Sequence, residues 1–242
     1  KTGSGALMET LPDALALAQT MVDIGKLAGK PVVAVITSMA QPLGTHIGNA
    51  LEVKDAIDVL AGRTQGDLLE ISLLLGSHML VLAEKARTLP EARAMLENAL
   101  SSGAGLRKLA EMIAAQGGDP RVVEDLSLLP QAAVKRVMQA ETAGYLSEMD
   151  TTALGMAAQR MGAGRAKKSD MLDYSVGYVL HVRLGDEVTE DTPLATLYAR
   201  NEAEAEEAEK AIRKALTIAR KKPQTPKLWD AVVTAEGITY NR

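Results

Sequence analysis

The sequence predicts a mixed α/β fold whose two parts differ in character. Residues 11–27 carry Leu, Ala, Met, Val and Ile at helical spacing, and residues 31–37 form a short β-branched run without polar alternation. Such a run is typical of a strand buried on both faces, and a helix followed by a buried strand is the order found in parallel α/β sheets. After Pro130 short strand patterns become frequent. We therefore divide the chain into residues 1–129 and residues 130–242.

The first part begins with a glycine-containing loop and is otherwise mostly helical. Thr10 and Asp13 suit the cap and the first turn of the helix at residues 11–27, and Pro12 suits its first turn as well. After the strand and a loop at residues 38–49, further helices are predicted at residues 51–60, 67–87, 90–101 and 106–115. The second of these is apolar on nearly all sides, which predicts a buried helix.

The second part combines short strands with two helices. Strands are predicted at residues 134–140, 145–149, 178–183 and 194–198, with a turn at residues 185–191. Helices are predicted at residues 152–161 and 201–222. The longer helix begins with Glu residues and ends with Arg and Lys residues, an order that complements the helix dipole. Pro223 and Pro226 stop it, and an edge strand is expected at residues 228–235.

The composition excludes several classes of protein. The net charge of −4 and the aromatic content of 2% argue against a nucleic-acid partner, which needs a basic face and stacking platforms. The most apolar segment, residues 71–83, is too short for a bilayer, which takes about 20 residues. The chain has no Cys, which rules out disulfides and thiolate chemistry, and its first residues lack a signal-peptide pattern. We expect a cytoplasmic protein without a membrane partner.

Two loops contain residues that could bind a ligand. Residues 1–8 place small side chains where a strand meets a helix, which permits close backbone approach to a ligand but is also typical of an ordinary turn. A second loop offers Leu43 and His46, with Asp55 one turn into the following helix. Carbonyl oxygens and a carboxylate can bind a hard cation. A solvated helix face would explain the same three residues.

Other chemistry is disfavoured by the remaining motifs. His78 and His181 lie on apolar elements and are expected to be packed and hydrogen-bonded, and no Ser/His/Asp order or HExxH motif is present. Residues 176–199 resemble the β units of lipoyl and biotinyl carrier domains. Those carriers attach their cofactor to a Lys at a hairpin tip, and the candidate segment at residues 148–155 contains no Lys. This unit is therefore expected to be structural.

Five motifs together resemble the pyrimidine-nucleoside phosphorylase family, which includes the thymidine phosphorylases, from Lys1 to about Leu197. The motifs are KTGSGALM, QPLG…IGNALEVKDAI, GDLLEISLLLGSHML, AQGGDPRVV and GAGRAKKSDMLD. The resemblance implies part of a large α/β phosphorylase domain, with a parallel sheet and helices, over residues 1–129. It implies an α+β, hammerhead-like C-terminal domain over residues 130–242.

The resemblance also implies an activity. Members of this family are pentosyltransferases that convert a pyrimidine nucleoside and inorganic phosphate to free base and pentose 1-phosphate, in nucleotide salvage and without an organic cofactor. A small helical domain holds the base and forms the homodimer. That domain, the base-binding Arg, Ser and Lys and the phosphate loop all precede the position of Lys1. We therefore expect no catalytic residue in this chain and no activity from it alone.

Four residues receive a role from the resemblance. Leu7 matches a position where some relatives place an apolar side chain beside the base. Leu43 and His46, through their carbonyls, and Asp55, through its carboxylate, match a potassium site of some bacterial members. Relatives often have Ala at the second position and Glu at the third. A stand-alone binding or scaffold domain and a related nucleotide phosphorylase are the alternatives to a nucleoside phosphorylase.

Overall fold

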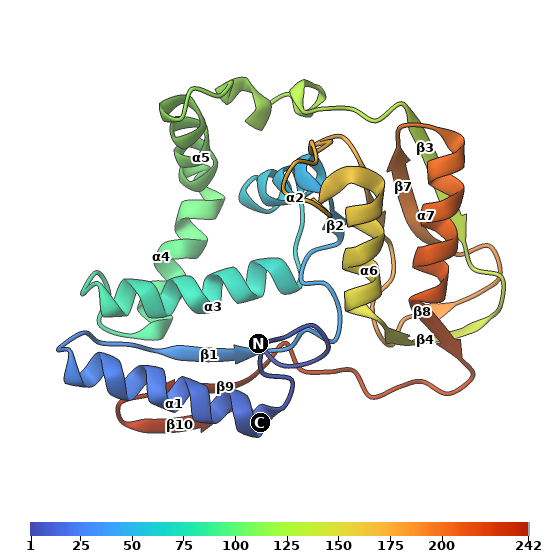
Figure 1. Cartoon of the computed structure of the whole chain (residues 1–242). Helices are drawn as coiled ribbons and strands as arrows, with labels where there is room; N and C mark the ends of the chain where they lie inside the picture. Colours follow the sequence, from blue (N-terminus) through green and yellow to red (C-terminus); the bar gives the residue numbers. More distant parts are fainter. Residues whose placement is uncertain (242) are drawn as a thin grey trace. The chain divides into compact units, whose positions relative to one another are not determined.

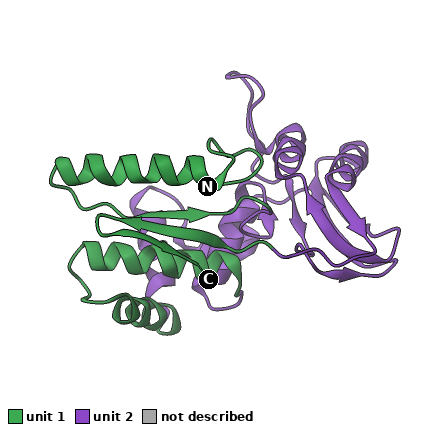
Figure 2. Ribbon diagram, turned by 90° about the horizontal axis from the view of Figure 1, so that it is seen from below, with its two compact units in different colours: residues 1–40, 65–102, 226–242 green, residues 41–64, 103–225 purple. Residues whose placement is uncertain are grey.

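The computed structural model describes residues 1–241, which form two compact units (Figure 2). Unit 1 combines residues 1–40 and 65–102 with the described residues from 226 onward, and unit 2 combines residues 41–64 and 103–225. Each unit is thus assembled from segments that are distant in the sequence. The division at residues 129 and 130 stays a prediction, because compactness does not mark where a sequence domain ends.

Unit 1 is a small antiparallel sheet with three helices (Figure 1). Its elements are α1 (Leu11–Leu27), β1 (Ala34–Thr37), α3 (Asp67–Leu82), α4 (Leu89–Ser101), β9 (Trp229–Thr234) and β10 (Gly237–Tyr240). Ala14, Ala18 and Val22 of α1 pack on Ile36, Ala231 and Val233 of the sheet. The Thr10 hydroxyl caps α1 by accepting from the Asp13 amide at 3.3 Å, as predicted.

The strand predicted at the C-terminal end of the chain lies inside the sheet rather than at its edge. The strand order is β1-β9-β10, so β9 pairs on both sides. The prediction missed β10, which forms a hairpin with β9 through the turn before Gly237. Both ladders are antiparallel, whereas a parallel sheet was expected for residues 1–129; parallel pairing among residues 1–241 is confined to the isolated bridge between Thr2 and Ser38.

The helix predicted to be buried on nearly all sides is only partly buried. In α3, Ile71, Leu73 and Ser77 are buried, whereas Met79 is 68% exposed. The buried side packs on α4, where Leu96 lies so close to Gly76 that an added Cβ would approach its Cδ1 to 2.9 Å. The prediction from apolar composition therefore overestimated how much of α3 is covered by other parts of unit 1.

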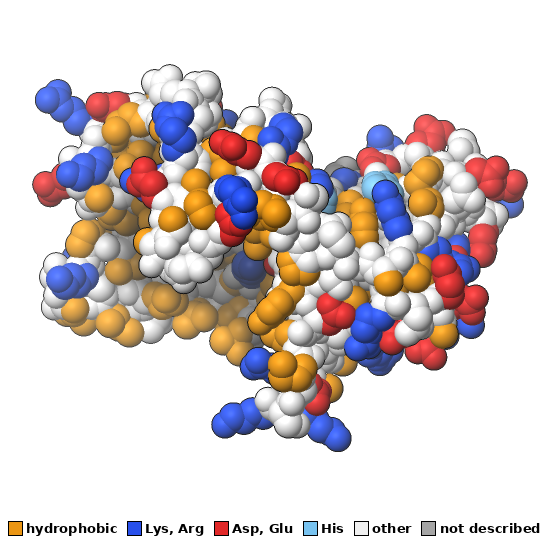
Figure 3. Space-filling view, turned by 90° about the horizontal axis from the view of Figure 1, so that it is seen from above, with side chains coloured by type: hydrophobic (Ala, Val, Ile, Leu, Met, Phe, Trp, Pro, Cys, Tyr) orange, Lys and Arg blue, Asp and Glu red, His pale blue; other side chains and the backbone are white. Residues whose placement is uncertain are grey.

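Unit 2 consists of two antiparallel sheets with helices. Its elements are β2 (His46–Ile47), α2 (Asn49–Leu60), α5 (Ala104–Ala115), η1 (Pro120–Val123), η2 (Leu126–Leu128), β3 (Val134–Gln139), β4 (Gly144–Met149), α6 (Thr151–Ala158), η3 (Gln159–Ala163), β5 (Gly177–Leu180), β6 (Glu187–Val188), β7 (Pro193–Ala199), α7 (Glu202–Lys214) and β8 (Leu216–Ala219). The strand orders are β2-β5-β7-β3 and β6-β4-β8. Acidic and basic side chains are interspersed on the surface of this unit, at the right of Figure 3.

The prediction of one long helix at residues 201–222 is wrong for the second half of that range. The helix α7 ends at Lys214, and residues 216–219 form β8, which pairs with β4. Leu216 lies opposite Met149 and Ile218 opposite Leu146, so cross-strand packing prevails over the helical propensity of the Lys-rich sequence. Within residues 1–241, no helix is both long and apolar enough to cross a membrane.

Candidate functional site at the β2–α2 junction

The QPLG…IGNALEVKDAI motif at residues 41–57 and the β segment at residues 176–199 meet in unit 2. Strand β2, from the first stretch, pairs antiparallel with β5, from the second, with His46 opposite Val179 and Ile47 opposite Tyr178. The Leu180 amide donates to the Thr45 carbonyl at 2.8 Å and extends this contact by one residue. The loop with the candidate cation ligands is therefore attached to the sheet of the C-terminal half of the chain.

Two glycines allow the backbones to approach where β2 leads into α2. Gly48 has φ +135° and Gly177 has φ +148°, values that other residues rarely adopt. A Cβ on Gly177 would lie 2.1 Å from the Ile47 carbonyl oxygen, and one on Gly48 would lie 2.4 Å from the Val176 carbonyl oxygen. Since each glycine faces backbone of the other strand, neither position has space for a side chain.

The start of α2 is held by further hydrogen bonds to the same part of unit 2. The Ala50 amide donates to the Tyr174 carbonyl at 3.0 Å, and the Asn49 side-chain amide donates to the Ala163 carbonyl at 2.9 Å. Ala163 ends η3, a single π-helical turn that continues α6. Such turns are often found at functional sites, and here the turn presents a carbonyl to α2.

The loop before β2 is clamped by the turn after β5. The Arg183 guanidinium donates to the Pro42 carbonyl at 2.6 Å and lies 3.5 Å from the Leu43 carbonyl. The Leu184 amide donates to the Gln41 side-chain oxygen at 2.9 Å. Nothing in the sequence pattern pointed to Arg183, because its partners are backbone carbonyls about 140 residues away.

His46 and Asp55 come together as a buried pair. Their side chains are 12% and 5% exposed, and His46 Nδ1 lies 3.5 Å from Asp55 Oδ1 and 3.0 Å from the Thr45 hydroxyl. Burial lowers the pKa of His46, and the attraction of Asp55 offsets this only in part, so the imidazole is neutral at pH 7. Among the described residues, the Asp55 carboxylate therefore has no fully charged cationic group in direct contact.

This donor set fits a hard monovalent cation better than a transition metal. A buried carboxylate and nearby backbone carbonyls are oxygen ligands of the kind that potassium accepts. Residues 1–241 contain no group of three or more His, Cys, Asp or Glu side chains arranged around a common point. The Leu43 carbonyl already accepts a hydrogen bond from Arg183, and Asp55 is the one negatively charged group among the three predicted ligands.

The other candidate residues lie apart from this pair. Leu7 is 88% exposed in the N-terminal loop of unit 1, so its side chain is available to a ligand. His181 is hydrogen-bonded through Nε2 to the Thr196 hydroxyl at 2.7 Å, as predicted, but it is exposed and not packed as expected. The prediction was wrong for His78, whose Nε2 is buried without a hydrogen-bond partner among the described residues, and burial lowers its pKa.

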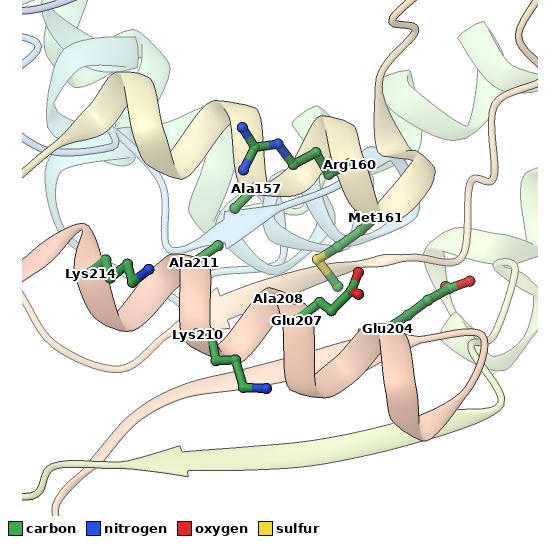
Figure 4. Close-up of a pocket in the computed structure, with 9 residues that line it drawn as sticks. All are labelled: Ala157, Arg160, Met161, Glu204, Glu207, Ala208, Lys210, Ala211 and Lys214. Atoms are coloured by element: carbon green, nitrogen blue, oxygen red, sulfur yellow. The ribbon is translucent and has the colours of Figure 1, made fainter.

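A groove between α6 and α7 does not form a second site. It has a volume of about 350 Å³ and a floor that includes Ala157, Met161 and Ala208. Figure 4 shows that the cationic groups of Arg160 and Lys210 point away from one another, and Glu207 lies beside Met161. The charges along this groove are of both signs and do not converge on one point.

Comparison with known proteins first defines the class of the chain. Residues 1–106 match the family model described as "Glycosyl transferase family, a/b domain", and residues 145–219 match "Pyrimidine nucleoside phosphorylase C-terminal domain". The mixed α/β architecture agrees with this pair of matches. The two matches therefore define the class of domains from which the chain is built, the a/b domain of a glycosyl transferase family followed by a pyrimidine nucleoside phosphorylase C-terminal domain.

Individual relatives define the family. The chain is 50% identical to the pyrimidine-nucleoside phosphorylases of Geobacillus stearothermophilus and Bacillus subtilis (strain 168) over 202 residues, which is 84% of the chain and 47% of each relative. It is 46% identical over 219 residues to that of Staphylococcus aureus (strain USA300), or 90% of the chain and 50% of the relative. The chain belongs to the pyrimidine-nucleoside phosphorylase family and spans about half the length of these relatives.

The glycine pair yields the first prediction. Gly177→Ala should destabilise the protein by about 2–4 kcal/mol, because the new Cβ meets the Ile47 carbonyl and the positive φ is strained. Gly155→Ala is the matched control, since a Cβ there meets nothing within 4 Å and Ala favours a helix over Gly by roughly 0.5–1 kcal/mol. The two variants should therefore shift the urea unfolding midpoint in opposite directions. Equal midpoints would contradict the assigned contact.

Asp58, on α2, yields a prediction about pH. Burial alone would raise its pKa, but hydrogen bonds from Lys54 at 2.6 Å and Arg63 at 2.7 Å outweigh burial and lower the pKa. A lowered folded-state pKa stabilises the fold above the unfolded value of about 3.9, and this contribution is lost as pH falls through the folded value. Asp58→Asn should cost about 1 kcal/mol at pH 7, because solvent screens the two half-exposed cations.

The measurement for Asp58 is urea unfolding of the parent and the variant between pH 3 and pH 7. The difference between them should shrink below about pH 4. Glu111→Gln, which removes an exposed partner of Lys108, is the control and should change little at any pH. A cost for Asp58→Asn that is constant across the pH range would show that its hydrogen bonds, rather than its charge, stabilise α2.

Proposed function

We propose that this chain forms part of an enzyme that cleaves pyrimidine nucleosides with phosphate, giving free base and pentose 1-phosphate. The observation that supports the proposal is identity of 46–50% to three phosphorylases over most of the chain, in two separately matched regions. Nucleoside and inorganic phosphate are the substrates that follow from this family. No organic cofactor is included in the proposal.

The chemistry requires two charged features. The base leaves with negative charge that cationic side chains must stabilise, and a phosphate anion must be held beneath the anomeric carbon. We map neither feature onto this chain, because the family's base-binding Arg, Ser and Lys and its phosphate loop have no counterpart in residues 1–242. In the proposal the chain supplies Leu7 beside the base and the β2–α2 junction, while the remaining half of the relatives' length supplies the reacting groups.

The test is complementation. The chain alone should release no base from uridine or thymidine, and release should appear when it is combined with the part of the Geobacillus relative that it does not match. Omitting phosphate should abolish that release. Faster reaction with the 5′-monophosphates would make the protein a nucleotide phosphorylase instead. Stable association without any phosphate-dependent release would make it a scaffold or binding domain.

We also propose that the junction holds a potassium ion, with Asp55 as its charged ligand and the Leu43 and His46 carbonyls as neutral ligands. The proposal is supported by the buried carboxylate beside a neutral imidazole. The ion would neutralise the carboxylate and fix the loop before α2. This role is structural, so it can be measured without catalysis.

The test of the cation compares potassium with sodium at equal ionic strength. Potassium should raise the thermal midpoint by a few degrees, since a ligand that binds only the folded state at about 100 times its Kd stabilises by about 2.7 kcal/mol. Asp55→Asn should remove the potassium-specific shift, whereas Asp58→Asn, which alters an acid already paired with Lys54 and Arg63, should retain it. Equal midpoints in both salts would exclude the ion.

The proposal also includes three further statements. They are homodimeric assembly through the family's helical domain, a cytoplasmic location and a role in pyrimidine salvage. These three statements rest on family membership and on no contact in the described residues.

A further inference from the structure

A pocket in unit 2 lies between the first turns of α2, the segment around η2 and strand β7. Its volume is about 240 Å³. That exceeds the roughly 150 Å³ of a cavity that takes benzene and is below the roughly 300 Å³ at which pockets for drug-sized ligands begin. The apolar part of the lining consists of Ala50, Leu51, Leu126, Leu129, Pro130 and Ala132. The pocket therefore suits a ligand with a single ring.

The wall of the pocket around η2 is held in place by the protein itself. Leu126 and Leu129 pack on a buried cluster that includes Ile57. The Gln131 side-chain amide donates to the carbonyls of the same two leucines, at 3.3 and 2.8 Å. Ser127 and Gln131 are exposed, so a ligand can enter from this side while the wall stays packed.

Three polar side chains of the lining can act only as hydrogen-bond acceptors. The Ser127 hydroxyl donates to Asp125 and the Ser175 hydroxyl donates to Asp173, each at 2.6 Å. A hydroxyl has one hydrogen, so each serine has only lone pairs left for a ligand. The Gln131 nitrogen is engaged with two carbonyls, which leaves its side-chain oxygen.

Lys54 and Tyr198 are the hydrogen-bond donors of the described lining. The Lys54 ammonium donates to Asp58 at 2.6 Å and keeps two further N–H groups. The Tyr198 hydroxyl has no hydrogen-bond partner among residues 1–241, and its ring lies 5.9 Å from Lys135 Nζ. On β5, Tyr198 pairs with Gly177, which has no side chain to cover the ring. Both donors are therefore available to a ligand.

The charges around the pocket disfavour ionic ligands. An anion would compete with Asp58 for Lys54 and would approach Asp125 and Asp173, which lie behind the two serines. A cation would meet the Lys54 ammonium, the charged group of the lining. A neutral ligand avoids both costs, because it can accept from Lys54 and Tyr198 while it donates to a serine or glutamine oxygen.

We propose that this pocket binds a small, neutral cyclic amide. Its carbonyl accepts from Lys54 and Tyr198, its N–H donates to the acceptors on the η2 side, and its ring lies against Leu51 and Leu129. The site is separate from the candidate cation site, because the lining includes neither His46 nor Asp55.

The probe is uracil, titrated into the whole chain, with the affinity and the location read from backbone amide shifts. Uracil is a neutral cyclic amide and a product of the proposed reaction, and only this choice of probe rests on the proposed function. We expect saturation with a Kd of about 1 mM, which is ordinary for a ligand of this size. The largest shifts should occur at the amides of Ser127, Gln131 and Ser175. Benzoate and benzylamine, which carry a negative and a positive charge on a similar ring, should bind about tenfold more weakly or worse.

Two pairs of variants locate the ligand. Tyr198→Phe should weaken uracil binding about fivefold through the loss of one neutral hydrogen bond, and Tyr240→Phe, on the exposed strand β10, should leave it unchanged. Ala132→Leu should fill the pocket and abolish binding, whereas Ala133→Leu, at the exposed next position outside the lining, should retain it. Thermal unfolding of each variant checks that it folds, and the tyrosine pair decides if Ala132→Leu does not.

Three results would overturn the proposal. The first is the absence of shifts at about 10 mM uracil, which is tenfold above the expected Kd. The second is unchanged uracil affinity in both Ala132→Leu and Tyr198→Phe, which would place the ligand elsewhere. The third is tighter binding of benzoate than of uracil, which would make the pocket an anion site. None of these results bears on the proposed function, which is tested by release of base in the complementation experiment.

Discussion

The close approach of two backbones at Gly48 and Gly177 is the constraint on which unit 2 depends. Because neither residue has a Cβ, β2 lies against β5, and the first turn of α2 can reach the carbonyls of Ala163 and Tyr174. The clamp from Arg183 and the buried contact between His46 and Asp55 follow from that placement. The candidate cation site is therefore a product of long-range packing more than of its own short motif.

The sequence was most informative where local pattern and packing agree. The cap at Thr10, the buried face of α1 and strands β3, β4 and β7 were predicted from the local sequence pattern, and the structure contains all of them. Spacing and resemblance together singled out Asp55, which proves to be buried beside His46. Its depth could not be derived from the sequence, since an acid one turn into a helix is usually solvated.

The failures arise where distant segments decide the outcome. Residues 216–219 leave the helical pattern because β4 offers them a strand partner, and β9 is internal because the hairpin to β10 gives it a second neighbour. Composition indicates how apolar a segment is, but not how many neighbours it has. The same limit explains the exposed Met79 of α3 and the contact between Arg183 and Pro42.

The glycine contact also has a kinetic consequence. Gly48 and Gly177 are 129 positions apart (177 minus 48), and residues 65–102, which lie between them, belong to unit 1. Closing so long a loop is entropically costly and slow compared with forming a helix. The junction around Asp55 should therefore be among the last regions to become ordered during folding. A nascent chain would carry α2 without its final partners until residues 162–186 had been synthesised.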